Sequence, residues 1–311
     1  MTTRTSKLNC EHLESREMMA GDITAFVSSG HLYVVEAYGE AGQGQAAAIS
    51  QLADGRLRVK GLTSQDGGTS LVNGAAYKDF WVSGDLKVDF RAGNDTLQLV
   101  RNTAIKGIDI NMSSSSSVAA TDRDYVYVDG IRTDNQLNIR TGVGPDTVKV
   151  WDSVIGNDGS IYDNLDITTG AGRDIVEIFR STRSMEVKGH IYVNTYSAGE
   201  AETDRVTILS ALAGRHISIS TGNGQDIIAM TDVWTGSDVL ISAGEGNDTV
   251  SLREVRATDD FWVYLHGGDD KLDIQYLNCD QLTLDGGAGY DSFSSSVPGH
   301  SNGSTVTGFE A

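Results

Sequence analysis

Aspartates at regular intervals are the residues of this sequence best suited to chemistry. Most of them follow a glycine by two positions, and this Gly-x-Asp motif places them at Asp95, Asp146, Asp174, Asp226, Asp248, Asp270 and Asp291. Asp124 and Asp204 are two further members that lack the glycine. Carboxylate oxygens can bind a hard cation such as Ca²⁺, act as general acids or bases, or accept hydrogen bonds from N–H groups of a turn. Which of these roles applies depends on the secondary structure that positions the aspartates.

The flanking residues show that each aspartate belongs to a repeat. The last four intervals between these aspartates are 21 or 22 residues long, and earlier ones reach 30. Apolar residues stand two and four positions after each Asp, as Val250 and Leu252 do after Asp248. Another apolar pair, here Val239 and Ile241, stands nine and seven positions before it. This alternation predicts two strands per repeat, each with one buried face.

The repeat favours a solenoid. It contains no helical pattern that could form a crossover between strands, and the chain has 36 Gly but only 2 Pro, where average usage gives roughly 15 Pro. We therefore predict an all-β, single-domain, right-handed parallel β-helix (β-solenoid) with about 22 residues per coil and three faces. Insertions in the longer repeats, including residues 113–117, are expected to form loops on the outer surface.

The repeat also suggests how the chain is divided. Residues 22–83 keep strand-like runs without the Asp corner, and the open ends of a solenoid need caps. We therefore expect an N-terminal sorting or processing segment at 1–21, irregular first coils and an N-terminal cap at 22–83, the regular β-helix at 84–293, and a C-terminal cap or tail at 294–311.

Composition excludes several partners. The formal net charge is −19, and no basic run is long enough to follow a phosphate backbone, so we expect no nucleic acid and no anionic membrane as a partner. The 39% of hydrophobic residues are too scattered for a membrane span. Cys10 and Cys279 do not have metal or redox spacing.

The corner sequences resemble a known calcium-binding repeat. Residues 286–293, Gly-Gly-Ala-Gly-Tyr-Asp-Ser-Phe, are similar to the RTX motif, Gly-Gly-x-Gly-x-Asp-x-apolar-x, which binds Ca²⁺. The resemblance implies Ca²⁺ as a cofactor, and stacking of the coils would supply as ligands Asp226, Asp248, Asp270 and Asp291, with Asp269 beside them. RTX copies follow one another about every nine residues, whereas here they occur once per coil. The alternative role for these aspartates is to brace the turns through backbone N–H groups.

The N-terminus resembles a sorting signal. Residues 13–21, Leu-Glu-Ser-Arg-Glu-Met-Met-Ala-Gly, are similar to the LEPR-type motif of planctomycete surface proteins, with Ser15 in place of Pro and Met18-Met19 in place of Leu-Leu. The resemblance implies export, so the expected location is secreted or at the cell surface.

Two functions remain open. Parallel β-helices often carry polysaccharide lyases and hydrolases, and the best acidic cluster for such a carbohydrate-active enzyme, beside Trp262 and Tyr264, consists of Asp259, Asp260, His266, Asp269, Asp270 and Asp273. No nucleophile motif, phosphate loop or HExxH pattern is present, and we assign no catalytic residue. We therefore expect a non-enzymatic, exported structural or adhesive module, with an extracellular polysaccharide or a surface protein as its partner.

Overall fold

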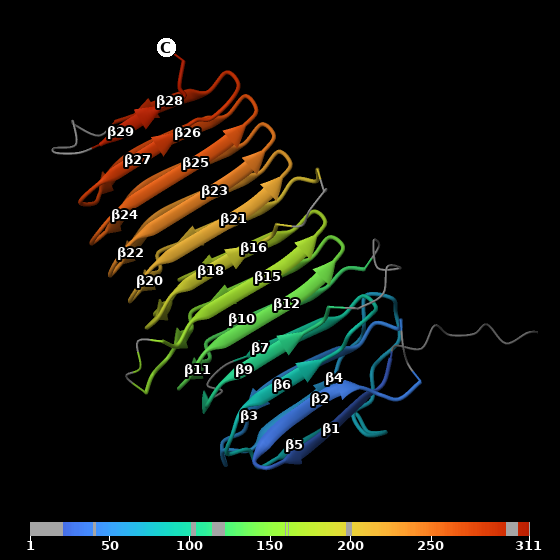
Figure 1. Cartoon of the computed structure of the whole chain (residues 1–311). Helices are drawn as coiled ribbons and strands as arrows, with labels where there is room; N and C mark the ends of the chain where they lie inside the picture. The colour runs from blue at the N-terminus through green and yellow to red at the C-terminus, as the bar shows by residue number, and fades with distance from the viewer. Residues whose placement is uncertain are drawn as a thin grey trace, which may run out of the picture.

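The chain forms a stack of β-coils. The computed structural model describes residues 21–39, 42–100, 104–113, 122–158, 160, 162–196, 201–296 and 304–310. These residues contain no helix, and hence none long and apolar enough to cross a bilayer. The coils rise in sequence order from one end of the molecule to the other, as the colour gradient in Figure 1 shows. The predicted all-β parallel β-helix is confirmed.

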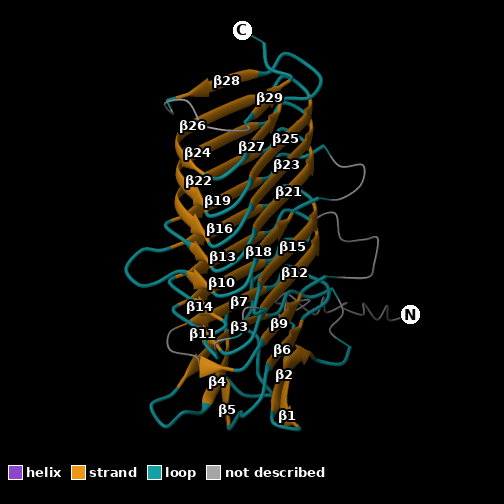
Figure 2. Cartoon of the chain, turned by 60° about the vertical axis from the view of Figure 1, so that its left-hand side comes forward, coloured by secondary structure: helices purple, strands orange, loops and turns teal. Residues whose placement is uncertain are grey.

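Two long sheets run along the stack, on opposite sides in Figure 2. The first is 12-stranded and consists of β1 (Ile23–Ser28), β2 (His31–Glu36), β6 (Leu86–Asp89), β9 (Ile108–Asn111), β12 (Leu137–Val143), β15 (Leu165–Ala171), β18 (Ile191–Asn194), β21 (Ile217–Asn223), β23 (Val239–Glu245), β25 (Phe261–Gly267), β27 (Leu282–Asp285) and β29 (Thr305–Thr307). Each of these strands lies before an Asp corner or in the equivalent position of an end coil.

The second sheet is 17-stranded and follows the corners. It consists of β3 (Ala46–Gln51), β4 (Leu57–Gly61), β5 (Tyr77–Phe80), β7 (Thr96–Val100), β8 (Ala104–Ile105), β10 (Tyr125–Asp129), β11 (Arg132–Thr133), β13 (Thr147–Trp151), β14 (Val154–Ile155), β16 (Ile175–Phe179), β17 (Glu186–Val187), β19 (Arg205–Leu209), β20 (Leu212–Ala213), β22 (Ile227–Thr235), β24 (Thr249–Ala257), β26 (Lys271–Asn278) and β28 (Ser292–Ser295).

Parallel pairing places equivalent residues of successive coils side by side. Val206 pairs with Ile228, Ile228 with Val250, and Val250 with Leu272. The two repeats without the glycine are in the same register, since β10 pairs with both β7 and β13, and β19 with both β16 and β22. The predicted period of 22 residues is therefore the coil length where no residues are inserted.

The second sheet bends to give the coil its third face. Within β22, β24 and β26 the bend falls at Asp232, Glu254 and Tyr276, whose φ angles of 53°, 54° and 61° are left-handed. In earlier coils the strand is interrupted, and the third face is made by short strands such as β14 and β17, which pair with each other. A single left-handed residue thus turns the chain without leaving the sheet.

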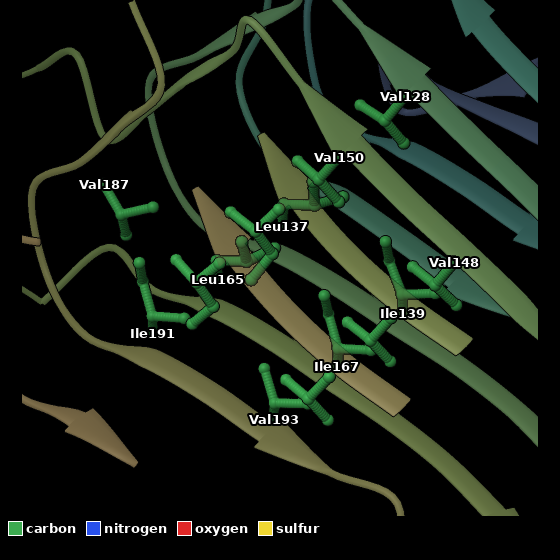
Figure 3. Packing of buried hydrophobic residues seen from close by; sticks show 14 of the residues in the cluster. Val128, Leu137, Ile139, Val148, Val150, Leu165, Ile167, Val187, Ile191 and Val193 are labelled. Carbon is green, nitrogen blue, oxygen red and sulfur yellow. The ribbon is translucent and has the colours of Figure 1, made fainter. Parts of the chain in front are cut away.

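The interior is filled by stacked aliphatic side chains. Leu137, Leu165 and Ile191 form one such column, with each residue paired to the next, and Figure 3 shows it beside the column of Ile139, Ile167 and Val193. All lie within one continuous core cluster and are buried. Burial of each large aliphatic side chain contributes about 1.5–3 kcal/mol to folding, so the columns hold the coils together.

The N-terminal end differs from the regular coils. Strand β1 runs antiparallel to β2, and β4 runs antiparallel to both β3 and β5. The side-chain amide of Asn73 accepts a hydrogen bond from the N–H of Ala25 and donates one to its carbonyl, at 2.9 and 2.7 Å. Asn73 therefore occupies part of the outer edge of β1 as a neighbouring strand would.

The other end is covered by residues that follow the last repeat. Strand β29 pairs with β27, and the ring of Phe309 lies 5.4 Å from that of Phe293. Two expectations fall outside the described residues: the sorting motif, apart from Gly21, and residues 114–117 of the serine-rich insertion.

A charge in an aliphatic column tests the register. Val250 is fully buried between Ile228 and Leu272, so Val250→Asp places a carboxylate among apolar neighbours and should lower the free energy of unfolding by several kcal/mol or abolish folding. The matched control is Ala229→Asp, since Ala229 faces outward between Thr207 and Ser251. Urea denaturation measures both variants, and equal stabilities would contradict the register.

Candidate functional site

In most corners between the two sheets, glycine stands where the backbones of successive coils are in contact. In the corner before Asp248, Gly244 and Gly246 have φ angles of 110° and 127°. A Cβ atom on either glycine would overlap the carbonyl oxygen of Gly222 or Gly224 in the preceding coil. His266 is equivalent to Gly244 and also has a positive φ, 74°. The glycines thus allow successive corners to stack in contact.

The repeated aspartates form a continuous column joined by hydrogen bonds. In each coil the backbone N–H of Asp donates to Oδ1 of the Asp in the next coil, and we call this arrangement the aspartate ladder. The N–H to Oδ1 bonds are 2.7–3.0 Å long and link in order Asp95, Asp124, Asp146, Asp174, Asp204, Asp226, Asp248, Asp270 and Asp291. The ladder therefore includes all nine aspartates identified from the sequence.

Two residues of other types extend the aspartate ladder. The backbone N–H of Gln45 donates to Oδ1 of Asp95 at 2.7 Å, and that of Asp291 donates to Oε2 of Glu310. Sequence reasoning missed both, because neither stands in a Gly-x-Asp motif. Two signals could have found Glu310: its spacing of 19 residues from Asp291, close to one coil, and Gly308 two positions before it, which has a φ angle of 73°.

Burial makes these carboxyls weaker acids than an exposed aspartate. It raises the pKa of Asp204 and Asp248 to about 8, that of Asp146 to about 7 and that of Asp270 to about 6. Neighbouring ladder carboxylates add to the shift for Asp204 and Asp248, and the N–H that each accepts opposes it. Neutralising the negative charge of these carboxylates, by a bound proton or a bound cation, is therefore favourable near neutral pH.

The ladder hydrogen bonds use only Oδ1 of each aspartate carboxyl, so the second oxygen, Oδ2, is the atom that could bind a cation. Oδ2 of Asp226, Asp248, Asp270 and Asp291 is buried and has no hydrogen-bond partner among the described residues, and the same holds for Asp95, Asp146 and Asp204 in the earlier coils. Ca²⁺ takes about six to eight oxygen ligands, whereas each coil offers one such oxygen. These atoms fit a cation in donor type, but one site would have to draw on several coils or on carbonyl groups.

Asp269 lies outside the aspartate ladder, on the exposed side of the same corner. Its N–H donates to Oδ1 of Asn247 and its own Oδ1 accepts from the N–H of Tyr290, both at 2.9 Å. The structure thus brings Asp226, Asp248, Asp270 and Asp291 into one buried column and places Asp269 beside it. Their assignment as calcium ligands stays a prediction.

The acidic cluster considered for an enzyme is divided between places far apart. Asp259 and Asp260 precede β25 and His266 lies near its C-terminal end, which separates them by about 20 Å of extended chain. His266 Nε2 lies 2.8 Å from the hydroxyl of Ser242. Asp273 faces outward on β26, where it accepts a hydrogen bond from Ser294 at 2.7 Å.

Other polar groups gather near Asp259 and Asp260. One carboxylate oxygen from each lies within 4.8 Å of one from Asp238. Nδ1 of His216 is 2.6 Å from Oδ2 of Asp238, and the His216 ring stacks on that of His190 at 4.7 Å. His190 and His216 occupy equivalent positions just before β18 and β21, which pair in register. The coil between them is 26 residues long because it contains an insertion, so the sequence spacing of the two histidines gave no sign of the contact.

Comparisons with protein-family models, curated proteins and solved structures find no match for this chain. Its function must therefore be argued from the aspartate ladder and the outer surface alone.

The raised pKa values predict how stability depends on pH. An unfolded aspartate releases its proton near 3.8, whereas folded Asp146 holds it until about pH 7. The folded state thus binds more protons over this range, so in EDTA the protein should lose stability as the pH rises from about 4 to about 8. Urea denaturation at a series of pH values measures the loss.

A ladder variant identifies the source of that loss. Asp146→Asn keeps an oxygen to accept the N–H of Asp124 but removes the titrating proton, so we expect the loss of unfolding free energy to shrink by roughly 2–4 kcal/mol. Asp166→Asn, on the outward face of β15, is the control and should leave the profile unchanged. Parallel profiles for wild type and Asp146→Asn would exclude the ladder as the cause.

Proposed function

We propose that this protein is a non-enzymatic β-helix that serves as an exported structural or adhesive module. The observation that carries the proposal is the aspartate ladder itself, because the acids that recur in every repeat accept backbone N–H groups between coils. Because these aspartates hold successive coils together along the whole stack, their repeated role is the one expected of a rigid structural rod.

Part of the acidic cluster does not converge on one place. General acid–base cleavage of a glycosidic bond needs two carboxyl groups within about 10 Å of each other, and Asp238, Asp259 and Asp260 meet this distance, so they are the groups that a cleavage assay must test. Asp259 and His266 lie at opposite ends of β25. Asp270 is buried, with its Oδ1 accepting the N–H of Asp248.

Export is part of the proposal and rests on the N-terminal resemblance alone. A long acidic rod whose partners are polysaccharides or surface proteins would act outside the cell. Expression in a bacterial host that carries the matching sorting machinery, followed by fractionation, tests this location with a chain lacking residues 1–21 as the control.

Incubation with polysaccharides tests the non-enzymatic role. We expect the full chain, with and without Ca²⁺, to release no reducing ends and no unsaturated uronates from neutral or acidic polysaccharides beyond the level of a protein-free control. Time-dependent release that Asp259→Asn or Asp260→Asn abolishes would establish the carbohydrate-active enzyme instead.

We further propose that Ca²⁺ stabilises the C-terminal coils, with Asp226, Asp248, Asp269, Asp270 and Asp291 as its ligands. Buried Oδ2 atoms without a hydrogen-bond partner among the described residues, including those of Asp226, Asp248, Asp270 and Asp291, favour a cation on this column, and the RTX-like corner at residues 286–293 favours the C-terminal coils. A divalent cation would replace the protons that these carboxyls otherwise retain, and would reduce repulsion between charges about 5 Å apart.

Calcium should then raise the melting temperature. A ligand that binds only the folded state stabilises it by RT ln(1 + [L]/Kd), so we expect a rise of a few degrees in millimolar Ca²⁺ relative to EDTA. The rise should be larger at about pH 8 than at about pH 5, where protons compete for the same oxygens.

Two variants localise the effect. Asp270→Asn should remove most of the gain, whereas Asp146→Asn, whose corner contains Thr141 and Pro145, should retain it. Identical melting curves in EDTA and Ca²⁺ would assign the aspartate ladder to bracing alone.

A further inference from the structure

A groove lies on the outer surface beside the Asp corners of the middle coils. Its volume is about 650 Å³, and its lining includes Gln65, Arg123, Tyr125, Thr147, Arg173 and Ile175. This volume is within the range typical of small-ligand sites, about 300–1,000 Å³. The groove is therefore large enough to hold part of a polymer chain.

Strand register explains the floor of the groove, and a distant loop explains one wall. Tyr125, Thr147 and Ile175 are the outward residues that begin β10, β13 and β16, and they lie side by side. Gln65 comes from the segment between β4 and β5, and its Nε2 donates to the carbonyl oxygen of Arg123 at 3.2 Å. The groove thus joins the N-terminal coils to the regular ones.

Two exposed arginines line this groove, together with the buried Asp124. Arg123 and Arg173 are exposed and form no ion pair within the described residues. Arg205 pairs in register with Ile175 on the next coil and likewise has no ionic partner among the residues described. In a chain of net charge −19, three such guanidinium groups together favour an anionic ligand.

Aromatic side chains continue from the groove along the same strands. Tyr127, Trp151 and Phe179 are half-buried, and the Trp151 ring makes edge-to-face contacts with the other two, with centroids 5.5 Å from Tyr127 and 5.4 Å from Phe179. Trp151 and Phe179 are in register, whereas Tyr127 is in register with Lys149, which pairs with Glu177 at 2.9 Å. Aromatic rings with a polar edge provide flat apolar surfaces on which a sugar ring can lie.

The spacing of the arginines suggests the polymer. Arg123 and Arg173 belong to coils two apart, with Pro145 between them, so their backbones are about 10 Å apart along the stack. This distance is comparable to the length of a disaccharide. A chain with an acid group on every sugar, or on every second sugar, could therefore place an acid opposite each arginine.

We propose that the outward surface of β10, β13 and β16 binds a carboxylated or sulfated polysaccharide. Arg123 and Arg173 pair with its acid groups, and Tyr125, Tyr127 and Trp151 contact its sugar rings. This inference rests on the proposed adhesive function and names the class of its ligand.

Affinity electrophoresis in EDTA tests the proposal with the full chain. Polygalacturonate and dextran sulfate are the probes, with uncharged dextran and single-stranded DNA as comparisons. We expect one or both acidic polysaccharides to retard the protein and uncharged dextran not to do so. The double variant Arg123→Ala/Arg173→Ala should weaken this binding about tenfold or more, and Trp151→Ala should weaken it independently of salt.

A matched pair of arginines controls for net charge. Arg253→Ala/Arg256→Ala removes two exposed arginines from β24 on the same sheet and should leave the affinity unchanged. Melting temperatures equal to that of wild type would show that the variants fold. Equal losses in the two double variants, or DNA binding as tight as that of the polysaccharides, would overturn the proposal.

The failures of this proposal and of the proposed function are distinguishable. Retardation by neither acidic polysaccharide would refute the groove as a glycan site and leave the non-enzymatic rod untouched. Cleavage of a polysaccharide would refute the rod's non-enzymatic role without bearing on whether Arg123 and Arg173 bind it.

Discussion

The hydrogen bond from one aspartate N–H to the carboxylate of the next coil determines most of this structure. It requires the carboxyl group to point into the corner, and it requires the two corners to lie in contact. A Cβ on Gly246 would overlap the preceding corner's carbonyl oxygen. The glycine thus allows the close approach of the corners that the hydrogen bond to the Asp248 carboxylate requires. The cost is a column of buried acids whose pKa values are raised, and the aliphatic columns beside it offset that cost.

The regular part of the fold follows from local pattern alone. Alternation of apolar residues and a constant period are enough to place Val206, Ile228 and Val250 side by side. The antiparallel first coils could not be predicted in this way. There the edge of β1 is covered by Asn73, which lies 48 residues from its partner Ala25, and no repeat connects the two.

The site is predictable to a similar extent. The nine aspartates share a repeat, and Glu310 follows Gly308 in a Gly-x-Glu variant of its motif, whereas Gln45 joins their column through position alone. Sequence proximity was misleading for Asp260 and His266, because an extended strand carries neighbours in sequence far apart in space. The groove could not be foreseen either, since one of its walls, Gln65, comes from a loop of the N-terminal coils.

The aspartate ladder also has a direction. The backbone N–H of each ladder aspartate finds its acceptor in the coil that follows it in the chain, whereas other corner N–H groups, such as that of Asp269, donate to the coil before. A coil that leaves a ribosome or an export channel therefore has one buried donor without an acceptor until about 22 further residues have emerged. Assembly that begins at the N-terminus would leave the newest coil, at every stage, with one N–H that lacks its acceptor. For the last aspartate of the ladder, Asp291, Glu310 supplies that acceptor.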